Sequence, residues 1–375
     1  MKILYLTHDL RDAAVHKRTA MFKDGGADVT VAGFRRGAEP VNSVAGSAAV
    51  DLGRTYDGNF PQRVLSVLRE VLCLKKRRTL FEGADVIVAR NLEMLAIAVR
   101  GRSLCARPPV LVYESLDIHR LLLNKGPAGK ALRRLEGWLS KRASALITSS
   151  PAFVSSYFEP LSDVRLPVRM VENKVYAPGA EIPASSARTP GPPWRIGWFG
   201  ALRCKKSLHI LQELVRQSSG NIEVILRGSP ALDQMPDFHD AVAATPGLTF
   251  AGPYKNPDDL AAIYRDVHFT WAIDMFEEGL NSSWLLPNRL YEGGLYDAVP
   301  IALKAVETGR FLDWMGLGVT LEAPLPAALR KFFGDLTIQG YQSLEKHAME
   351  TPRSCWRYNK SDCESLVGYL STLKD

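Results

Sequence analysis

One segment in the second half of the chain combines helix-start, acidic and glycine signals in a way that suits ligand binding. It is Leu285–Ile301, with the sequence LLPNRLYEGGLYDAVPI. Pro287 favours the start of a helix, and Glu292 then lies in the first turns of that helix. A carboxylate there can accept hydrogen bonds from ligand hydroxyl groups, and Gly293 and Gly294 let the backbone approach a neighbour closely. Stabilisation of the carboxylate by the helix dipole alone is the alternative explanation.

A second segment, Gly197–Ser207, places a glycine and several cations between a predicted strand and a predicted helix. The strand ends at Phe199, and Gly200 permits a tight turn. Arg203 and Lys206 then stand at the expected start of the helix. Cations beside the free N–H groups of a helix N-terminus suit a diphosphate. A solvated basic turn without a ligand is the alternative.

Three groups that can exchange protons stand directly after an apolar run, Pro109–Tyr113, which we expect to be a buried strand. They are Glu114, Asp117 and His119. Carboxylates and imidazoles are common general acids and bases. Capping and local hydrogen bonds within the loop are the alternative roles for these residues.

The first loop of the chain offers a similar set. His8 and Asp9 follow the apolar run Lys2–Thr7, and Arg18 lies in the helical stretch that comes next. Asn91 follows another apolar run further along the chain. These side chains suit polar recognition, and a plain connecting loop is an equally good explanation.

Short apolar runs alternate with helical segments along the whole chain, and these elements must position the loops. Such a βα alternation predicts parallel, doubly wound sheets, in which ligands bind beyond the carboxyl ends of the strands. A length of 375 residues fits two domains. The stretch rich in Pro, Ala and Ser predicts a linker at 177–193, between a first domain (1–176) and a second (194–357). The last part of the chain, about 358–375, is expected to be an amphipathic helix.

The two halves of the chain differ in charge. The first 190 residues carry 29 Lys and Arg against 18 Asp and Glu, whereas the remainder carries 18 against 22. The excess of 11 positive charges in the first half suggests an anionic partner, such as a membrane surface, a phosphorylated lipid or nucleic acid. A solvated basic face with no partner is the alternative.

The segment Val64–Phe81 places apolar residues at helical spacing beside a basic cluster, Lys75, Lys76, Arg77 and Arg78. This combination suits a helix that lies on a membrane surface. A core-facing helix with a solvated basic end is the alternative. A basic stripe interleaved with aromatic residues is missing, which disfavours nucleic acid.

The cysteines and the apolar runs indicate in which cellular compartment the protein is expected. Five scattered cysteines show no metal-ligand spacing, and their odd number fits a reducing compartment. No uncharged apolar run approaches the about 18 residues that a bilayer requires. The N-terminus runs directly into a predicted strand rather than a signal peptide. We therefore expect a cytoplasmic protein, peripheral on the inner face of the membrane.

Three segments of the second half resemble GT-B glycosyltransferases, most closely family 4 and exopolysaccharide-assembly members. Leu285–Ile301 resembles the nucleotide-binding helix, where runs of the type Asn-Lys-x-x-Glu-x-x-x-x-Gly-x-Pro-Val recur. Phe199–Ser207 is similar to the family's Phe-Gly-Arg-Leu-x-x-x-Lys-Gly loop, with Lys206 at the phosphate-binding lysine. Gly252–Leu260 resembles the loop near the base. The resemblance implies the GT-B architecture: two Rossmann-like domains facing a central cleft, with the C-terminal helix packing back on the first domain.

The resemblance also implies roles for particular residues. A nucleotide sugar would be bound by residues of the second domain, namely Gly200, Arg203, Lys206, Tyr254, Asn288, Arg289 and Glu292. The reaction centre would include Asp9, Glu114, Asp117 and His119. The acceptor would contact His8, Arg18 and Asn91.

One position departs from the family pattern. Family 4 carries two glutamates eight residues apart, and Trp284 stands where the first of them would precede Glu292. The role of that glutamate is vacant, or it is taken by Asp274, Glu277 or Glu278. Retaining and inverting stereochemistry therefore both stay open.

The resemblance implies a hexosyltransferase. It would move a sugar from a nucleotide sugar, expected to be a uridine diphosphate sugar, to a hydroxyl of a lipid-diphosphate-linked oligosaccharide in exopolysaccharide assembly. Because no Asp-x-Asp motif is present, we expect neither a metal nor another cofactor, and we expect no nucleic-acid partner. A nucleotide-sugar 2-epimerase of the same architecture and a non-catalytic GT-B-like scaffold are the alternatives. The sugar, the acceptor, the linkage and the oligomeric state stay open.

Overall fold

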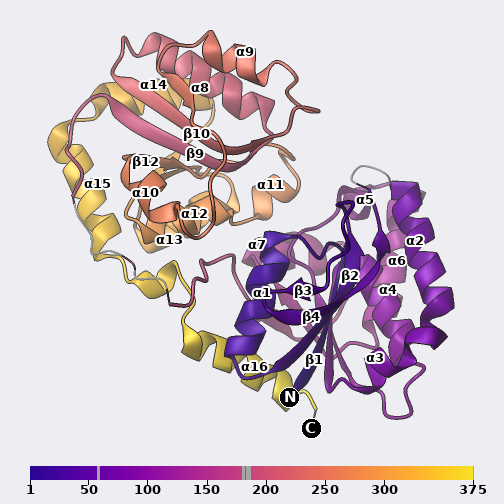
Figure 1. Ribbon diagram of the computed structural model, residues 1–375. Coiled ribbons are helices and arrows are strands. Elements are labelled where there is room, and N and C mark those ends of the chain that lie inside the picture. Colours follow the sequence, from indigo (N-terminus) through magenta and orange to yellow (C-terminus); the bar gives the residue numbers. More distant parts are fainter. Residues whose placement is uncertain (57–59, 180–181, 183–186, 375) are drawn as a thin grey trace. The chain divides into compact units, whose positions relative to one another are not determined.

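The chain forms two compact units in the computed structural model, which describes residues 1–56, 60–179, 182 and 187–374 (Figure 1). The first unit comprises Met1–Glu172 and the segment from Asn359 onward, and the second comprises Asn173–Tyr358. The sequence-based boundary after residue 176 falls a few residues later than this division. Val175 already belongs to the second unit, because its backbone N–H donates to Trp356 O at 2.8 Å and its carbonyl accepts from Tyr358 N at 2.9 Å.

The first unit is built on an eight-stranded sheet in the order β3-β4-β2-β1-β5-β6-β7-β8. All neighbours are parallel except β3 and β4, which form a short antiparallel pair. The order reverses between β1 and β5, and loops beyond such a switch point commonly bind ligands. The strands are β1 (Lys2–Thr7), β2 (Asp28–Arg35), β3 (Ser43–Val44), β4 (Ser47–Arg54), β5 (Val86–Arg90), β6 (Val110–Glu114), β7 (Ala145–Thr148) and β8 (Val168–Met170).

Helices cover both faces of this sheet. Figure 1 shows α1 and α16 on one side and α2, α4 and α6 on the other. The C-terminal helix α16 packs on α1, so the predicted return of the C-terminus to the first domain is confirmed. The helices are α1 (Ala13–Asp24), α2 (Phe60–Cys73), α3 (Arg78–Glu82), α4 (Asn91–Arg102), α5 (Arg120–Leu123), α6 (Pro127–Ser140), α7 (Pro151–Phe153) and α16 (Lys360–Thr372).

The predicted helical segment Val64–Phe81 is not one continuous helix. It begins within α2, passes through a 3₁₀ turn at Leu74–Arg77 and ends within α3. Leu74 is buried although its neighbours Lys75 and Lys76 are exposed. The tighter 3₁₀ turn is therefore the point where the chain turns one apolar side chain inward and leaves the basic residues outside.

The second unit contains a six-stranded, wholly parallel sheet in the order β11-β10-β9-β12-β13-β14. In chain order this is the 3-2-1-4-5-6 arrangement of a Rossmann fold, with its switch point between β9 and β12. The predicted pair of doubly wound domains is therefore confirmed. The strands are β9 (Trp194–Leu202), β10 (Ile222–Pro230), β11 (Leu248–Phe250), β12 (Phe269–Trp271), β13 (Val299–Leu303) and β14 (Val319–Leu321).

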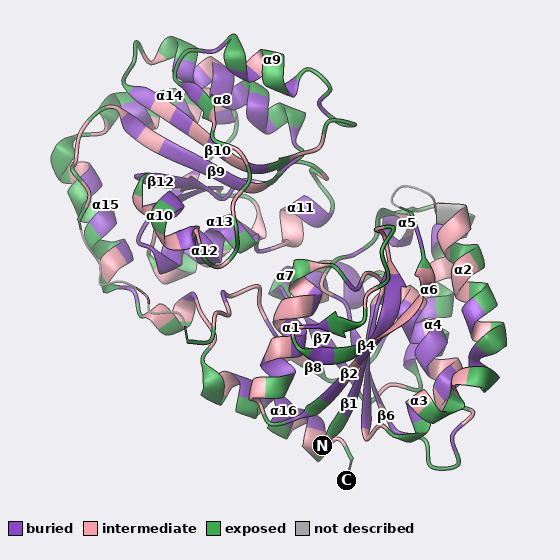
Figure 2. Ribbon diagram, in the orientation of Figure 1, coloured by how far each residue is buried: buried purple, intermediate pink, exposed green. Residues whose placement is uncertain are grey.

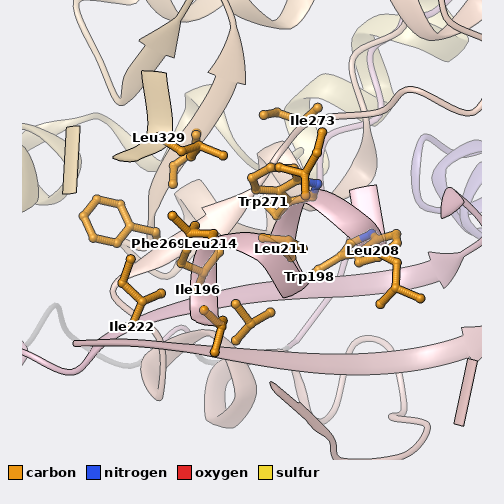
Figure 3. Packing of buried hydrophobic residues seen from close by; sticks show 14 of the residues in the cluster. Ile196, Trp198, Leu208, Leu211, Leu214, Ile222, Phe269, Trp271, Ile273 and Leu329 are labelled. Atoms are coloured by element: carbon orange, nitrogen blue, oxygen red, sulfur yellow. The ribbon is translucent and has the colours of Figure 1, made fainter. Parts of the chain in front are cut away.

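Separate hydrophobic cores fill the two faces of the second sheet. On one face, Trp198 and Trp271 of the sheet pack with Leu211 of α8 (Figure 3), and both tryptophans are buried. Strand β9 is largely buried, as its mainly purple colour in Figure 2 shows. The other face packs α10, α12 and α13. The helices are α8 (Lys205–Gln217), α9 (Phe238–Ala243), α10 (Leu260–Arg265), α11 (Asn281–Trp284), α12 (Asn288–Leu295), α13 (Glu307–Met315), α14 (Leu325–Asp335) and α15 (Ile338–Glu350), followed by a 3₁₀ turn at Arg353–Cys355.

The predicted linker 177–193 lies partly outside the described residues, which lack 180–181 and 183–186. Its described end is fixed to the second unit by Arg188. The guanidinium donates to the carbonyls of Asp297, Tyr264 and Tyr296 at 2.7–2.9 Å and pairs with Glu345 at 3.3 Å. This end of the segment is therefore part of a folded domain rather than a free tether.

Among the helices of the described residues, none combines the length and the apolar character needed to cross a bilayer.

Candidate functional site

Glycines shape the carboxyl edge of the second sheet. Gly200, Gly228 and Gly252 have φ values of 108°, 126° and 78°, a region that other residues rarely adopt. Gly228 pairs with Gly200 across β9 and β10, and a Cβ on Gly228 would lie 1.9 Å from Gly200 O. Only glycine permits the backbones of Gly200 and Gly228 to approach so closely. The three glycines therefore leave backbone without side chains at the edge of the sheet near the switch point.

Glu292 is held firmly within α12, near this edge. The carboxylate is 5% exposed and accepts hydrogen bonds from Asn256 Nδ2 at 2.7 Å and from Tyr264 OH at 3.0 Å. Burial and the nearby Glu292 charge raise the pKa values of Tyr264 and Tyr254, so both phenols stay protonated at neutral pH. Asn256 had no sequence-based role, although its place in the loop that follows β11 could have indicated one.

Arg289, one turn before Glu292, is tied to the loop after β12. Its Nη2 donates to Ile273 O at 2.7 Å and lies 3.4 Å from Asp274 Oδ2. The Asp274 carboxylate also accepts from Phe276 N and from the hydroxyl of Ser282. Burial by itself would raise the pKa of Asp274, but the Arg289 charge and these hydrogen bonds outweigh it and lower the pKa. An ionised carboxylate therefore stands at the end of β12.

The two predicted phosphate-binding cations lie in the loop and first turn after β9. The Arg203 guanidinium stacks 4.6 Å from the centre of the Phe276 ring. Lys206 Nζ lies 2.5 Å from Glu278 Oε2, and both side chains are about half exposed. Both cations thus contact the loop between β12 and α11 while remaining open to solvent. Asn288, at the start of α12, is also exposed.

In the first unit, charged side chains gather at the carboxyl edge of the sheet. Asn91 begins α4 with a φ of 71°, a left-handed conformation that asparagine tolerates better than most residues. Its Nδ2 lies 3.3 Å from His8 Nδ1. Burial and the Arg90 guanidinium lower the pKa of His8 to about 4, so the ring is neutral at pH 7. The structure thus brings together two of the three predicted acceptor-binding residues.

Ion pairs surround His8 and Asn91 at this edge. Asp12 Oδ2 lies 3.3 Å from Arg90 Nη2 and 3.9 Å from His8 Nε2. Asp9 Oδ2 lies 3.5 Å from Arg36 Nε.

A third pair at the same edge joins Glu93 of α4 to Arg63 of α2. None of the cations in these pairs had a sequence-based role. Two of them could have been found as the residues that end or directly follow a strand, Arg90 after the apolar run of β5 and Arg36 after β2.

Glu114 and Arg18 lie beneath this edge and are bonded to each other. Arg18 Nε donates to Glu114 Oε1 at 2.7 Å, and Tyr5 OH donates to Glu114 Oε2 at 2.5 Å. Both charged residues are almost entirely buried. Arg90 Nη1 in turn donates to Tyr5 OH at 3.3 Å. Glu114 was predicted to be catalytic and Arg18 to contact the acceptor, and both roles require a side chain that reaches a substrate. Both side chains are instead buried, and together with Tyr5 they hold Arg90 in place.

The other two predicted catalytic residues, Asp117 and His119, lie exposed in the loop after β6. His119 caps α5, since its Nδ1 accepts from Leu121 N at 3.3 Å. Partial desolvation of the ring lowers the pKa of His119, the Glu93 charge opposes this shift, and the Arg63 charge contributes to it. This residue therefore belongs to the same charged edge as Glu93 and Arg63.

The metal-free reaction remains a prediction. In the part of the chain that the structure describes, no group of three or more His, Cys, Asp or Glu side chains is arranged to hold a metal ion.

Comparison with known proteins shows which family the chain belongs to. It is 47% identical to the succinoglycan biosynthesis protein ExoL of Rhizobium meliloti (strain 1021) over 378 residues, covering 100% of this chain and 94% of ExoL. This protein belongs to the family of the succinoglycan biosynthesis protein ExoL. A search of protein-family models gave no match.

Solved structures show that the ExoL-family chain has the GT-B fold over its whole length. Sucrose-phosphate synthase from Thermosynechococcus elongatus superposes with a TM-score of 0.74 at 12% identity, covering 99% of this chain and 98% of that one. Anabaena HepE in complex with UDP superposes with a TM-score of 0.68 at 15% identity, covering 99% and 100%. Within this fold, Gly200 lies near the end of β9, and the other predicted donor residues of the ExoL-family protein follow strands β9, β11 and β12 of the second unit.

Proposed function

We propose that this protein transfers a sugar from a uridine diphosphate sugar to a hydroxyl group of a lipid-linked oligosaccharide during exopolysaccharide assembly. The name of ExoL supports the pathway, and the HepE structures with UDP and with UDP-glucose support the donor class. The observation that carries the proposal is the fixed carboxylate of Glu292 beside the glycine edge of the second sheet.

The donor site follows from that carboxylate. Glu292, oriented by Asn256 and Tyr264, accepts hydrogen bonds from the ribose hydroxyls. The bare backbone near Gly200 lets the diphosphate approach, and the half-exposed Lys206 exchanges its partner Glu278 for a phosphate oxygen. Arg203 and Lys206 then stabilise the charge that develops on the leaving diphosphate, which is the task that a metal performs in other transferases.

The acceptor belongs to the first unit in this proposal. His8 and Asn91 contact it, and Asp117 and His119 act at the reaction centre. Its low pKa keeps the His8 ring neutral at pH 7, and a neutral imidazole can accept a hydrogen bond from a hydroxyl.

A membrane-facing surface on α2 supports a lipid-linked acceptor. Leu65, Leu68 and Leu72 recur at helical spacing and are 68%, 54% and 81% exposed. The exposed Lys75 and Lys76 follow in the next turn. An apolar stripe beside cations matches an anionic bilayer surface better than it matches water, so we propose that α2 lies on the inner membrane face.

The donor assignment is tested by isothermal calorimetry with UDP. We expect Glu292→Gln to weaken UDP binding at least about tenfold, because hydrogen bonds to a charged acceptor contribute about 1.5–3 kcal/mol. Glu322→Gln, at an exposed position of the same unit, is the control and should bind as the parent does. Equal UDP affinity in all three proteins would overturn the role of Glu292.

Incubation with UDP-glucose alone separates the alternatives. A 2-epimerase converts the donor without an acceptor, a transferase releases UDP slowly by hydrolysis, and a scaffold does neither. Detection of an epimerised nucleotide sugar by chromatography would contradict the proposed transfer.

Membrane association is tested by sedimentation with vesicles that contain about one third anionic lipid. We expect Leu68→Glu to reduce binding several-fold, since it places a charge within the apolar stripe. Leu161→Glu, at another exposed leucine of the same unit, is the matched control. Equal sedimentation of the two variants would exclude α2 as the contact.

A further inference from the structure

Three arginine–carboxylate pairs meet at the carboxyl edge of the first sheet, and we name them the edge pairs. They are Asp9 with Arg36, Asp12 with Arg90, and Glu93 with Arg63. The pairs come from the loops after β1 and β2, from the last residue of β5 and from helices α2 and α4. Residues so far apart in the sequence meet only because the strands are parallel and their carboxyl ends share one edge.

The edge pairs are close enough to act as one group. The pKa of Arg36 is lowered, first by burial and then by the charge of Arg63, while Asp9, Glu93 and Asp12 oppose the shift. His8 is influenced by Arg90, Asp12, Glu93 and Arg36 together. The charges of the three pairs therefore act on one another and on His8.

The charges of this group cancel. Three guanidinium groups face three carboxylates, His8 is neutral at pH 7, and the neighbouring Asp117 and Arg120 also cancel each other. A phosphate group needs a surplus of positive charge or of N–H donors at its site. Arg18, the cation predicted to contact the acceptor, is engaged with Glu114 below the edge. The edge pairs therefore do not favour an anion.

The same side chains suit the hydroxyl groups of a sugar. Each hydroxyl can donate to a carboxylate and accept from a guanidinium or an amide. The carboxylate side chains of Asp9, Asp12 and Glu93 are 15%, 28% and 22% exposed, so they are held in place while still reaching solvent. Asn91 adds an amide that can both donate and accept.

We propose that the edge pairs form a subsite for an uncharged sugar unit of the acceptor, and that any diphosphate of a lipid-linked acceptor lies outside this subsite. The inference rests on the proposed function, because only a transferase has an acceptor. It deepens that function, because the subsite recognises the glycan part of the acceptor and not its anionic lipid carrier.

Binding of small probes to the full chain tests the subsite. Saturation-transfer NMR with a panel of neutral methyl glycosides (glucose, galactose, mannose and N-acetylglucosamine) should show at least one that binds. We expect Glu93→Gln to weaken that glycoside about tenfold, since it removes an ionised acceptor. Glu82→Gln, in an exposed arginine pair with Arg78 before β5, is the matched control and should leave binding unchanged.

Inorganic pyrophosphate distinguishes a sugar subsite from a phosphate site. For a sugar subsite, pyrophosphate does not displace the glycoside from the parent protein. For a phosphate site, Glu93→Gln would leave a net positive charge and strengthen pyrophosphate binding, while Arg36→Gln would weaken it. That pair of opposite changes, or a glycoside panel that never binds, overturns the proposal.

UDP binding separates this inference from the proposed function. Glu93→Gln should bind UDP as the parent does, because Glu93 belongs to the first unit and the donor residues belong to the second. A parent protein that binds a glycoside through Glu93 but never binds UDP would retain the sugar subsite and refute the transferase.

Discussion

The two sheets present different chemistry at equivalent edges. Near the switch point of the second sheet lie glycine backbone and one buried carboxylate. At the switch point of the first sheet, ion pairs and a buried Arg18–Glu114–Tyr5 group prevail. We propose that these edges bind different ligands, a nucleotide with a charged diphosphate at the second sheet and a hydroxyl-rich ligand at the first. Substitutions at four residues test how far this contrast extends.

The largest effect is expected from Gly228→Ala at the glycine edge. The new Cβ would lie 1.9 Å from Gly200 O, and the φ of 126° is strained for alanine. Strain and overpacking together should cost about 4 kcal/mol in the free energy of unfolding, measured with urea. Gly220→Ala, with a φ of 83° and no atom within 4 Å of its Cβ, is the control and should cost only about 1 kcal/mol. Similar losses for the two would show that no close approach exists.

Glu114→Gln should break the buried group of the first unit. It leaves the Arg18 guanidinium buried without its charge partner, which typically costs about 3 kcal/mol. We expect a lower unfolding midpoint in denaturant and a weakened anchor for Arg90, with UDP affinity unchanged. Full stability with complete loss of sugar transfer would instead restore the predicted catalytic role of Glu114.

The pH dependence of stability should reveal His8. Its pKa falls from 6.5 to about 4 on folding, so the unfolded chain binds more protons between these values. The free energy of unfolding therefore decreases as the pH drops from 6.5 to 4, by on the order of 2 kcal/mol from this residue, and is constant above that window. His8→Gln should flatten the profile, while the exposed His209→Gln should not. Parallel profiles for the parent and His8→Gln would contradict a buried neutral His8.

The smallest effect is expected at Asn91. Asn91→Gly keeps the left-handed φ without strain and should preserve stability, while Asn91→Ala should lose about 1 kcal/mol. Both remove the amide next to His8, so both should weaken glycoside binding equally. If Asn91→Ala weakened glycoside binding and the stable Asn91→Gly did not, Asn91 would act only through its backbone conformation.

Local patterns were sufficient for much of the fold. Each apolar run that alternated with a helical segment became a strand, and the rule that ligands bind after parallel strands led to His8, Asn91, Lys206 and Glu292. The two-residue strand β3 escaped prediction because so short a segment has no detectable period. The eight-residue strand β4 escaped prediction because small and charged residues interrupt its apolar positions. Val64–Phe81 was predicted as one helix because its apolar spacing is helical at both ends, although a 3₁₀ turn interrupts it.

By itself, the sequence determined the two βα series, the glycine positions and the resemblance of Leu285–Ile301 to a nucleotide-binding helix, because these depend on residues near one another in the chain. Only the tertiary structure decided which charges face each other. Arg18 and Glu114 are 96 residues apart, and Asn256 and Glu292 are 36 apart. Such pairs are created when parallel strands align their carboxyl ends, and no local period encodes them. For this reason Glu114 looked catalytic in the sequence and is an anchor in the fold.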